Sequence, residues 1–184
     1  FDVTTDTNTP NAINVLGQPN FTNGSAAIDQ SRLYIPRGLA FDAGNNRLYV
    51  VDAENTRVVY HDVSSIVNGQ NAAGGLGLQD GSGTDSWNQS LINPPPNNKG
   101  FSLPYGVLLD TSTHRLFVSD ARNNRVLVFD LDANDTIVDR TADYVLGQTD
   151  FNNAVPAVAQ NRLNFPVGLA IDPIGNRLFV GDLN

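Results

Sequence analysis

The chain has 184 residues, a formal net charge of −8 at pH 7 and a pI near 4.4. It contains 23 Asn, 18 Asp, 16 Gly and 10 Pro, but one Glu, one Lys, no Met and no Cys. Because Glu, Lys and Met favour helices while Asn, Asp, Gly and Pro favour turns, this composition excludes a helix bundle or coiled coil. With 40% apolar residues the chain can bury a core, so the turn formers are expected to separate many short strands.

Charge and hydropathy exclude two classes of partner. The arginines are spread through the chain, whereas a surface that neutralises phosphates needs clustered Lys and Arg, so we expect no nucleic-acid binding. No apolar stretch approaches the roughly 18 to 20 residues that span a bilayer, so we expect no membrane insertion. A chain that begins at Phe1 fits either a removed leader or an excised portion of a longer sequence.

Three related segments follow one another along the chain, and each predicts a series of short strands. The first strand, a, begins at the glycine of a Pro-x-Gly string and ends in Asp; the second, b, has the form Arg-Leu-Tyr/Phe-Val-x-Asp; the third, c, begins with Arg-Val. A fourth strand, d, is predicted around Leu16, Leu76 and Leu146. Strand a falls at residues 38–42, 106–110 and 168–172, strand b at 47–52, 115–120 and 177–182, and strand c at 57–62 and 125–130.

These segments are internal repeats. Residues 15–54 match residues 145–184 without a gap and are identical at 20 of 40 positions. Four-residue connections between strands a and b are typical of hairpin loops built on a type I turn. Four-stranded antiparallel units that recur along one chain predict an all-β fold, the β-propeller, in which blades pack face to face around a central channel.

The strings Pro-x-Gly-Leu-Ala-x-Asp, Leu-Tyr/Phe-Val-x-Asp and Asn-x-Arg-Val-x-x-Phe/Tyr resemble those of the NHL-repeat β-propellers, most of which have six blades. The chain is also similar to the bacterial and archaeal members with long blades and a Val-Leu-Gly-Gln-x-x-Phe element, present here at residues 15–21 and 145–151. The resemblance implies the fold. It implies no single function, because family members include interaction platforms, extracellular modules and a few enzymes.

The repeat frame divides the single propeller portion, residues 1–184, into two part-blades and two full blades. Phe1 and Asp2 align with the end of a strand c, and the chain is three repeats less six residues, an Asn-x-Arg-Val-x-x string. Either it is a stretch of a longer propeller protein, or it is half of a six-bladed propeller that associates head to tail. The part-blades are residues 1–35 and 166–184, and the full blades are residues 36–103 and 104–165.

Two aspartate positions recur in each of the three repeats, at the ends of strands a and b, and together account for six residues. A catalytic carboxylate needs one special environment, so recurrence favours a structural role: capping turns and pairing with Arg47, Arg115 and Arg177 or with the neighbouring backbone. A calcium ion held in the channel by oxygen ligands is the alternative, for which Asp42, Asp110 and Asp172 are the candidates. The other three are Asp52, Asp120 and Asp182.

Catalytic motifs do not stand out. His61 and His114, the only histidines, fall at different positions of the repeat, and the clustered metal-binding histidines of the amidating-lyase relatives have no counterpart here. Motifs such as Gly-x-Ser-x-Gly, a phosphate loop or His-Glu-x-x-His are also absent from the sequence. We therefore predict that the chain is not an enzyme and needs no cofactor. A metal-dependent hydrolase or lyase, lactonase-like or amidating-lyase-like, with its site in the channel, is the alternative.

The non-repeating linkers are the expected place for specific binding. Trp87, the only tryptophan, is a candidate anchor for a sugar or a partner, or else pins its own loop. Four Asn-x-Ser/Thr triplets fall in linkers and are candidate glycosylation sites, at Asn20, Asn23, Asn88 and Asn134.

Together these observations predict a secreted, extracellular or cell-surface module for structure or interaction. Its expected partner is a second copy of itself or the remainder of a longer propeller chain, bound through the part-blades. Other proteins or glycans are possible partners, and carbohydrate binding is a further alternative function.

Overall fold

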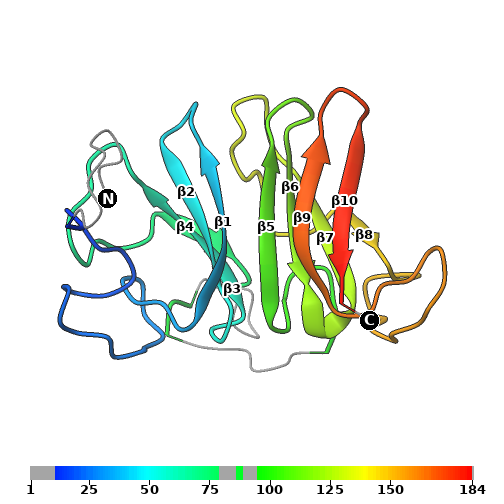
Figure 1. Cartoon of the computed structure of the whole chain (residues 1–184), viewed down its shortest axis with the longest axis horizontal. Coiled ribbons are helices and arrows are strands. Elements are labelled where there is room, and N and C mark those ends of the chain that lie inside the picture. Colours follow the sequence, from blue (N-terminus) through cyan, green and yellow to red (C-terminus); the bar gives the residue numbers. More distant parts are fainter. Residues whose placement is uncertain (1–10, 79–85, 89–94, 184) are drawn as a thin grey trace.

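The computed structural model describes residues 11–78, 86–88 and 95–183, and all of their regular structure is β-strand except one short 3₁₀ turn. The strands form two four-stranded antiparallel sheets, each in sequential order, and one two-stranded sheet (Figure 1). The first sheet contains β1 (Pro36–Asp42), β2 (Arg47–Asp52), β3 (Arg57–Asp62) and β4 (Gly74–Leu76). The second contains β5 (Pro104–Asp110), β6 (Arg115–Asp120), β7 (Arg125–Asp130) and β8 (Tyr144–Leu146), with the 3₁₀ turn η1 (Ala121–Asn123) between β6 and β7. The third contains β9 (Pro166–Asp172) and β10 (Arg177–Asp182).

This arrangement confirms the predicted fold class. Sequential four-stranded sheets packed side by side are the blades of a β-propeller, and the described residues contain two complete blades and half of a third. The innermost strands β1, β5 and β9 are neighbours in space and stand next to one another in Figure 1. The first strand of each sheet therefore lines the same side of the molecule.

Turn residues end the strands where the repeat predicts. Asp42 accepts a hydrogen bond from the backbone N–H of Asn45 (3.1 Å), which closes the turn between β1 and β2. Asn46 and Asn176, the last residues of the two matching turns, have φ angles of 50° and 49°. Asn tolerates this left-handed conformation better than most residues, which explains its place in these loops.

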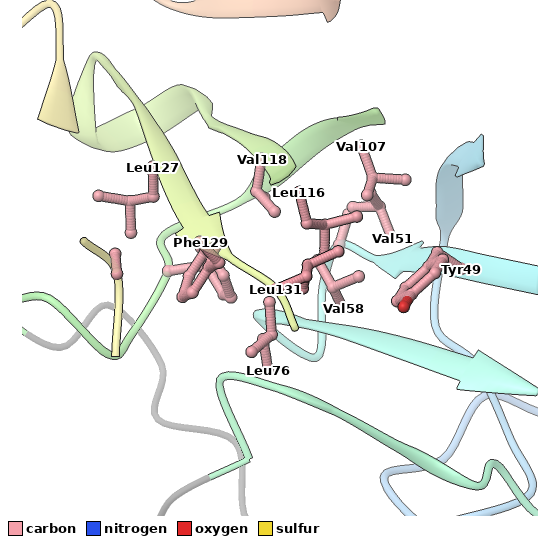
Figure 2. Close-up of a cluster of buried hydrophobic side chains, with 13 residues drawn as sticks. Tyr49, Val51, Val58, Leu76, Val107, Leu116, Val118, Leu127, Phe129 and Leu131 are labelled. Atoms are coloured by element: carbon pink, nitrogen blue, oxygen red, sulfur yellow. The ribbon is translucent and has the colours of Figure 1, made fainter. Parts of the chain in front are cut away.

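The main core lies between the first two sheets. Tyr49, Val51 and Val58 point from the first sheet towards Leu116 and Phe129 of the second, and all five side chains are buried (Figure 2). Alternate residues of each strand face this core, as the pleat of a strand requires. A separate apolar cluster around Phe117, Val126 and Val128 packs the second sheet against β9 and β10.

The backbones of the innermost strands approach one another closely at the glycine of each Pro-x-Gly string. A Cβ atom at Gly38 would lie 2.7 Å from the carbonyl oxygen of Tyr105, and one at Gly106 would lie 2.5 Å from that of Val167. Neither glycine therefore leaves room for a Cβ atom of its own. At the third glycine of the series, Gly168, a Cβ atom would meet nothing within 4 Å, because no described strand lies beyond β9.

One predicted strand is not formed. Residues 14–16 repeat the Val-Leu of β8, yet they are in no strand, because no described strand lies beside them to supply hydrogen bonds. β4 and β8, which carry the equivalent residues, each pair with the third strand of their own sheet. Phe1 and Asp2, predicted as the end of another such third strand, lie outside the described residues.

Close approach at Gly106 predicts a large effect of a single methyl group. Gly106→Ala forces the backbones of β5 and β9 apart, and we expect a loss of about 1–3 kcal/mol in the free energy of unfolding. Gly24→Ala is the matched control, because a Cβ at Gly24 meets nothing within 4 Å. Chemical denaturation of the two variants tests this, and equal stability would contradict the packing described for β5.

Candidate functional site

The three aspartates that end strands β1, β5 and β9 are each held by their own turn. Asp42 pairs with Arg47 (2.7 Å) and Asp172 pairs with Arg177 (2.6 Å), as the sequence predicts. Asp110 instead accepts hydrogen bonds from Ser112, while Arg115 pairs with the exposed Asp130. Burial alone would raise the pKa of Asp42, but hydrogen bonds from Asn45 and Arg47 outweigh it and lower the pKa.

These aspartates belong to three different sheets, and the structure does not bring them together into one site. Within the described part of the chain, no group of three or more His, Asp or Glu side chains is arranged to hold a metal ion. The candidate calcium ligands Asp42, Asp110 and Asp172 therefore serve separate hairpins.

The aspartates that end β2 and β6 form buried clusters that the sequence reasoning missed. Asp120 accepts hydrogen bonds from the backbone N–H of Ser102 (2.6 Å), from the amide of Asn123 (2.9 Å) and from Nε of Arg125 (2.8 Å). Arg125 is completely buried and also donates to the carbonyl oxygens of Phe151, Asn97 and Gly100. One arginine therefore fixes its own strand end and two linkers.

The first sheet repeats this arrangement. Asp52 accepts hydrogen bonds from the backbone N–H of Tyr34, from Asn55 and from Nε of Arg57 (2.7 Å). Arg57 also donates to the carbonyl oxygens of Asp29, Arg32 and Trp87. The spacing Asp-x-x-Asn-x-Arg, present in both repeats, is the sequence signal that identifies these clusters.

The third copy of this arrangement holds an aspartate without the arginine. Asp182 ends β10 and accepts a hydrogen bond from the backbone N–H of Asn164 (2.9 Å), as Asp52 does from Tyr34 and Asp120 from Ser102. Among the described residues no arginine pairs with Asp182, and no strand pairs with the outer edge of β10. We call this outer edge the β10 edge.

The faces at the two ends of the row of sheets are apolar and exposed. Phe179 of β10 is 54% exposed, whereas Tyr49, at the same position in the first sheet, is 0% exposed beneath the second sheet. On the opposite side of the row, Leu39 and Phe41 of β1 are 60% and 57% exposed, whereas Val107, the counterpart of Leu39 in β5, is buried. Each exposed position is therefore equivalent, in the repeat, to a position that a neighbouring sheet covers elsewhere in the chain.

A groove of about 500 Å³ opens between the second sheet and the β9–β10 sheet. Its walls are mostly apolar, with Val128, Tyr144 and Leu146 on one side and Ile171 and Leu178 on the other. Tyr144 and Leu146 are partly exposed in it. The groove lies where the third and fourth strands of the last sheet would cover β7 and β8 in a complete blade.

Trp87 packs against the linkers and not over the groove. Its ring contacts the cluster of Val50 and Val59, the Arg57 guanidinium lies 5.7 Å from the ring centroid, and its carbonyl oxygen accepts a hydrogen bond from Arg57. The side chain is half-buried. This placement is that of a residue that anchors its own loop.

The two histidines occupy different environments. His61 of β3 is buried, and although the backbone of Asn71 is close, neither ring nitrogen makes a hydrogen bond of regular geometry. Burial lowers the pKa of His61, and the charge of Arg57 lowers it further. His114 lies in the turn between β5 and β6, with Nδ1 2.7 Å from Asp135.

The four candidate glycosylation asparagines all lie outside strands. Asn20, Asn88 and Asn134 are exposed, and Asn23 is half-buried. The side-chain oxygen of Asn20 accepts hydrogen bonds from Thr22 and Asn23. The Gln-Ser that completes the Asn88 triplet lies outside the described residues.

Comparison with known proteins gives structural matches alone. No family model matches the sequence, and no curated protein matches it. A luciferin-regenerating enzyme is matched with 15% identity and a TM-score of 0.45 over 84% of this chain. An auxiliary nutrient binding protein from Bacteroides thetaiotaomicron is matched with 11% identity and a TM-score of 0.47 over 78% of this chain. The chain spans 39% and 34% of the lengths of these two proteins, respectively.

The name of the first of these two proteins corrects the prediction about enzymatic activity. The sequence led us to expect that the chain is not an enzyme, yet one propeller-like structure that matches most of it is named as an enzyme. The missing motifs belong to other folds and to particular families, so their absence does not exclude catalysis on this one. Separately, the described residues contain no helix long and apolar enough to cross a membrane.

The buried arginine clusters predict unequal effects of two similar substitutions. Arg125→Ala leaves Asp120 buried without its charge partner, and we expect a loss of about 3–5 kcal/mol in the free energy of unfolding. Arg115→Ala removes an exposed pair, for which at most about 1 kcal/mol is expected. Denaturant unfolding measures both, and similar losses would show that Arg125 is not the main support of its linkers.

Burial of His61 predicts a pH-dependent stability. Its pKa is lowered in the folded chain, so below the ordinary value of 6.5 the unfolded chain takes up a proton that the folded chain resists. Stability should therefore fall as pH falls below 6.5, by at most about 1.4 kcal/mol per pH unit from this group. His61→Phe, which copies Phe129 of the next repeat, should flatten the profile between pH 5 and 7. An unchanged profile in thermal unfolding would contradict this assignment.

Proposed function

We propose that the chain is an interaction module of NHL-type propeller blades that binds a second copy of itself. The face of the β9–β10 sheet that carries Phe179 docks on the exposed β1 face of the other copy. The observation that carries the proposal is Gly168, which keeps the Pro-x-Gly glycine of Gly38 and Gly106 at a place where no described strand comes near it.

The two open faces are complementary because each already has its partner inside the chain. Gly38 packs against the backbone of Tyr105 and Gly106 against that of Val167, so Gly168 is shaped to receive the residue at the same position of a further blade, which is Arg37. Phe179 on one face and Leu39 and Phe41 on the other supply the apolar surface. Such a head-to-tail contact is heterologous, and two contacts close a ring of two copies.

The finer assignments follow from the sequence. The repeated strings quoted above support NHL-type blades, and three exposed Asn-x-Ser/Thr asparagines support a secreted, glycosylated protein. An extracellular location is also in keeping with an acidic chain that lacks cysteine. In this setting the module would present its linkers to other proteins or glycans while its blades bind one another.

Self-association is tested by light scattering coupled to size-exclusion chromatography. We expect the 184-residue chain to elute as a dimer of twice 19.8 kDa that dissociates on dilution. Gly168→Val should give a folded monomer, because a Cβ atom at Gly168 meets nothing within 4 Å among the described residues but would clash with a docked strand.

Gly24→Val is the control, since a Cβ atom at Gly24 likewise meets nothing within 4 Å and Gly24 lies in a linker outside the strands that carry the two faces. It should leave the dimer intact. A wild-type chain that is monomeric at high concentration, or a Gly168→Val chain that still dimerises, would overturn the proposal.

A further inference from the structure

We infer that the β10 edge is a binding site for an extended peptide strand of the pattern Asn-x-Arg-Val-x-x-Phe-Asp. The inference builds on the proposed function, since it concerns the same incomplete sheet, but it involves the edge of β10 and not the face that carries Gly168. The partner is a polypeptide segment that adds a third strand to β9 and β10, with its arginine directed at Asp182.

The first support is the unfilled position at Asp182. In both complete sheets one carboxylate oxygen accepts a backbone N–H from the preceding linker, and the other accepts an asparagine amide and the Nε of an arginine on the third strand. Asp182 has the first of these contacts, from Asn164. An incoming Asn-x-Arg segment supplies the other two.

The second support is the linker before β9. Arg57 donates to the carbonyl oxygens of Asp29 and Arg32, and the ungapped repeat places Ala159 and Arg162 at the matching positions. The fold of this linker is also repeated, because Leu163 donates to the carbonyl oxygen of Gly147 as Leu33 does to that of Gly17. The repeat therefore places two carbonyl acceptors for an arginine in this linker, although that of Ala159 already accepts one hydrogen bond, from the backbone N–H of Arg162.

The third support is the apolar groove beside the same edge. In the second sheet, Leu127 and Phe129 of the third strand pack into the core against the first sheet. A strand on β10 places the equivalent residues against Val128 and Leu146, which line the 500 Å³ groove. The arginine thus fixes the register of the added strand. The two apolar residues equivalent to Leu127 and Phe129 are then buried in the groove.

The pairing of β6 with β7 gives the expected register. There Asp120 lies opposite Arg125, Phe117 opposite Val128 and Leu116 opposite Phe129. By the repeat, Asp182 lies opposite the arginine of the bound strand, Phe179 opposite its residue equivalent to Val128, and Leu178 opposite its phenylalanine. A partner segment is therefore identified by an arginine opposite Asp182 and, three positions later, a valine opposite Phe179.

The test uses the full 184-residue chain and a fluorescein-labelled synthetic peptide of residues 121–130, which carries the pattern. We expect saturable binding in fluorescence anisotropy. Replacing the peptide arginine, Arg125→Ala, should weaken binding about 10- to 100-fold, the range for losing hydrogen bonds to a charged group. Asp182→Asn in the chain should weaken it similarly while keeping the acceptor for Asn164.

Asp139→Asn is the matched control, because it removes the same charge from an exposed loop and should leave the affinity unchanged. A scrambled peptide of the same composition should not bind. The inference is overturned if the peptide does not bind, or if Asp182→Asn and Asp139→Asn bind it equally. The outcome does not depend on self-association, because binding of the peptide can also be measured with the Gly168→Val chain, which we expect to be monomeric.

The register is tested with cysteines, which the chain lacks. Phe179→Cys in the chain should form a disulfide with a peptide that carries Val128→Cys, because directly opposed residues in antiparallel strands lie within disulfide distance. A peptide with Leu127→Cys presents its thiol to the other face and should react at least tenfold more slowly. Equal reaction of the two peptides would overturn the register.

Discussion

The close approach of backbones at the Pro-x-Gly strings is the constraint on which the rest of this structure depends. Gly38 and Gly106 allow the backbones of β1, β5 and β9 to approach one another more closely than a Cβ atom at either position would permit. Ser119 bridges the second of these contacts, because its hydroxyl accepts a hydrogen bond from the backbone N–H of Gly106 and donates one to the carbonyl oxygen of Val167. The apolar core then fills the space further out, from Tyr49 to Phe129. Because every blade makes the same contact with the next, a sheet at the end of the row presents a shaped, unfilled surface.

Buried arginines provide the second layer of organisation. The long linkers contain little regular structure, and Arg57 and Arg125 hold them by hydrogen bonds to their backbone carbonyl oxygens. Each arginine is neutralised by the aspartate that ends the neighbouring strand, so strand, turn and linker become fixed together. Asp182 repeats the first contact of this arrangement, a hydrogen bond from the backbone N–H of Asn164.

Much of the fold could be predicted from the sequence because the signals are local and repeated. The Pro-x-Gly, Arg-Leu-Tyr/Phe-Val-x-Asp and Asn-x-Arg-Val strings, with the segments around Leu76 and Leu146, predicted the four strands of both complete sheets. The strand around Leu16 was wrong, because a strand needs a neighbour and the pattern of one segment does not show whether the neighbour is present. The buried arginine clusters were also missed: the spacing Asp-x-x-Asn-x-Arg marks Asp120 and Arg125, but the linker carbonyl oxygens that Arg125 also binds leave no trace in residue identity.

Function was less predictable than fold, because the same blades support several activities. The absence of familiar catalytic motifs led to an exclusion of enzymatic activity, but those motifs belong to particular families and folds, so their absence does not exclude catalysis here. The proposed association is supported by three features of the described residues: the exposed apolar side chain of Phe179, Gly168 with no described strand against it, and Asp182 with no described arginine paired to it.

An experimental structure of the associated chain tests the central claim most directly, through the surroundings of Gly168. The account predicts that the carbonyl oxygen of Arg37 in a second copy lies within about 4 Å of the Cα of Gly168, as that of Tyr105 lies against Gly38 within one chain. Two copies joined through any other surface, with Gly168 left facing solvent, would contradict it.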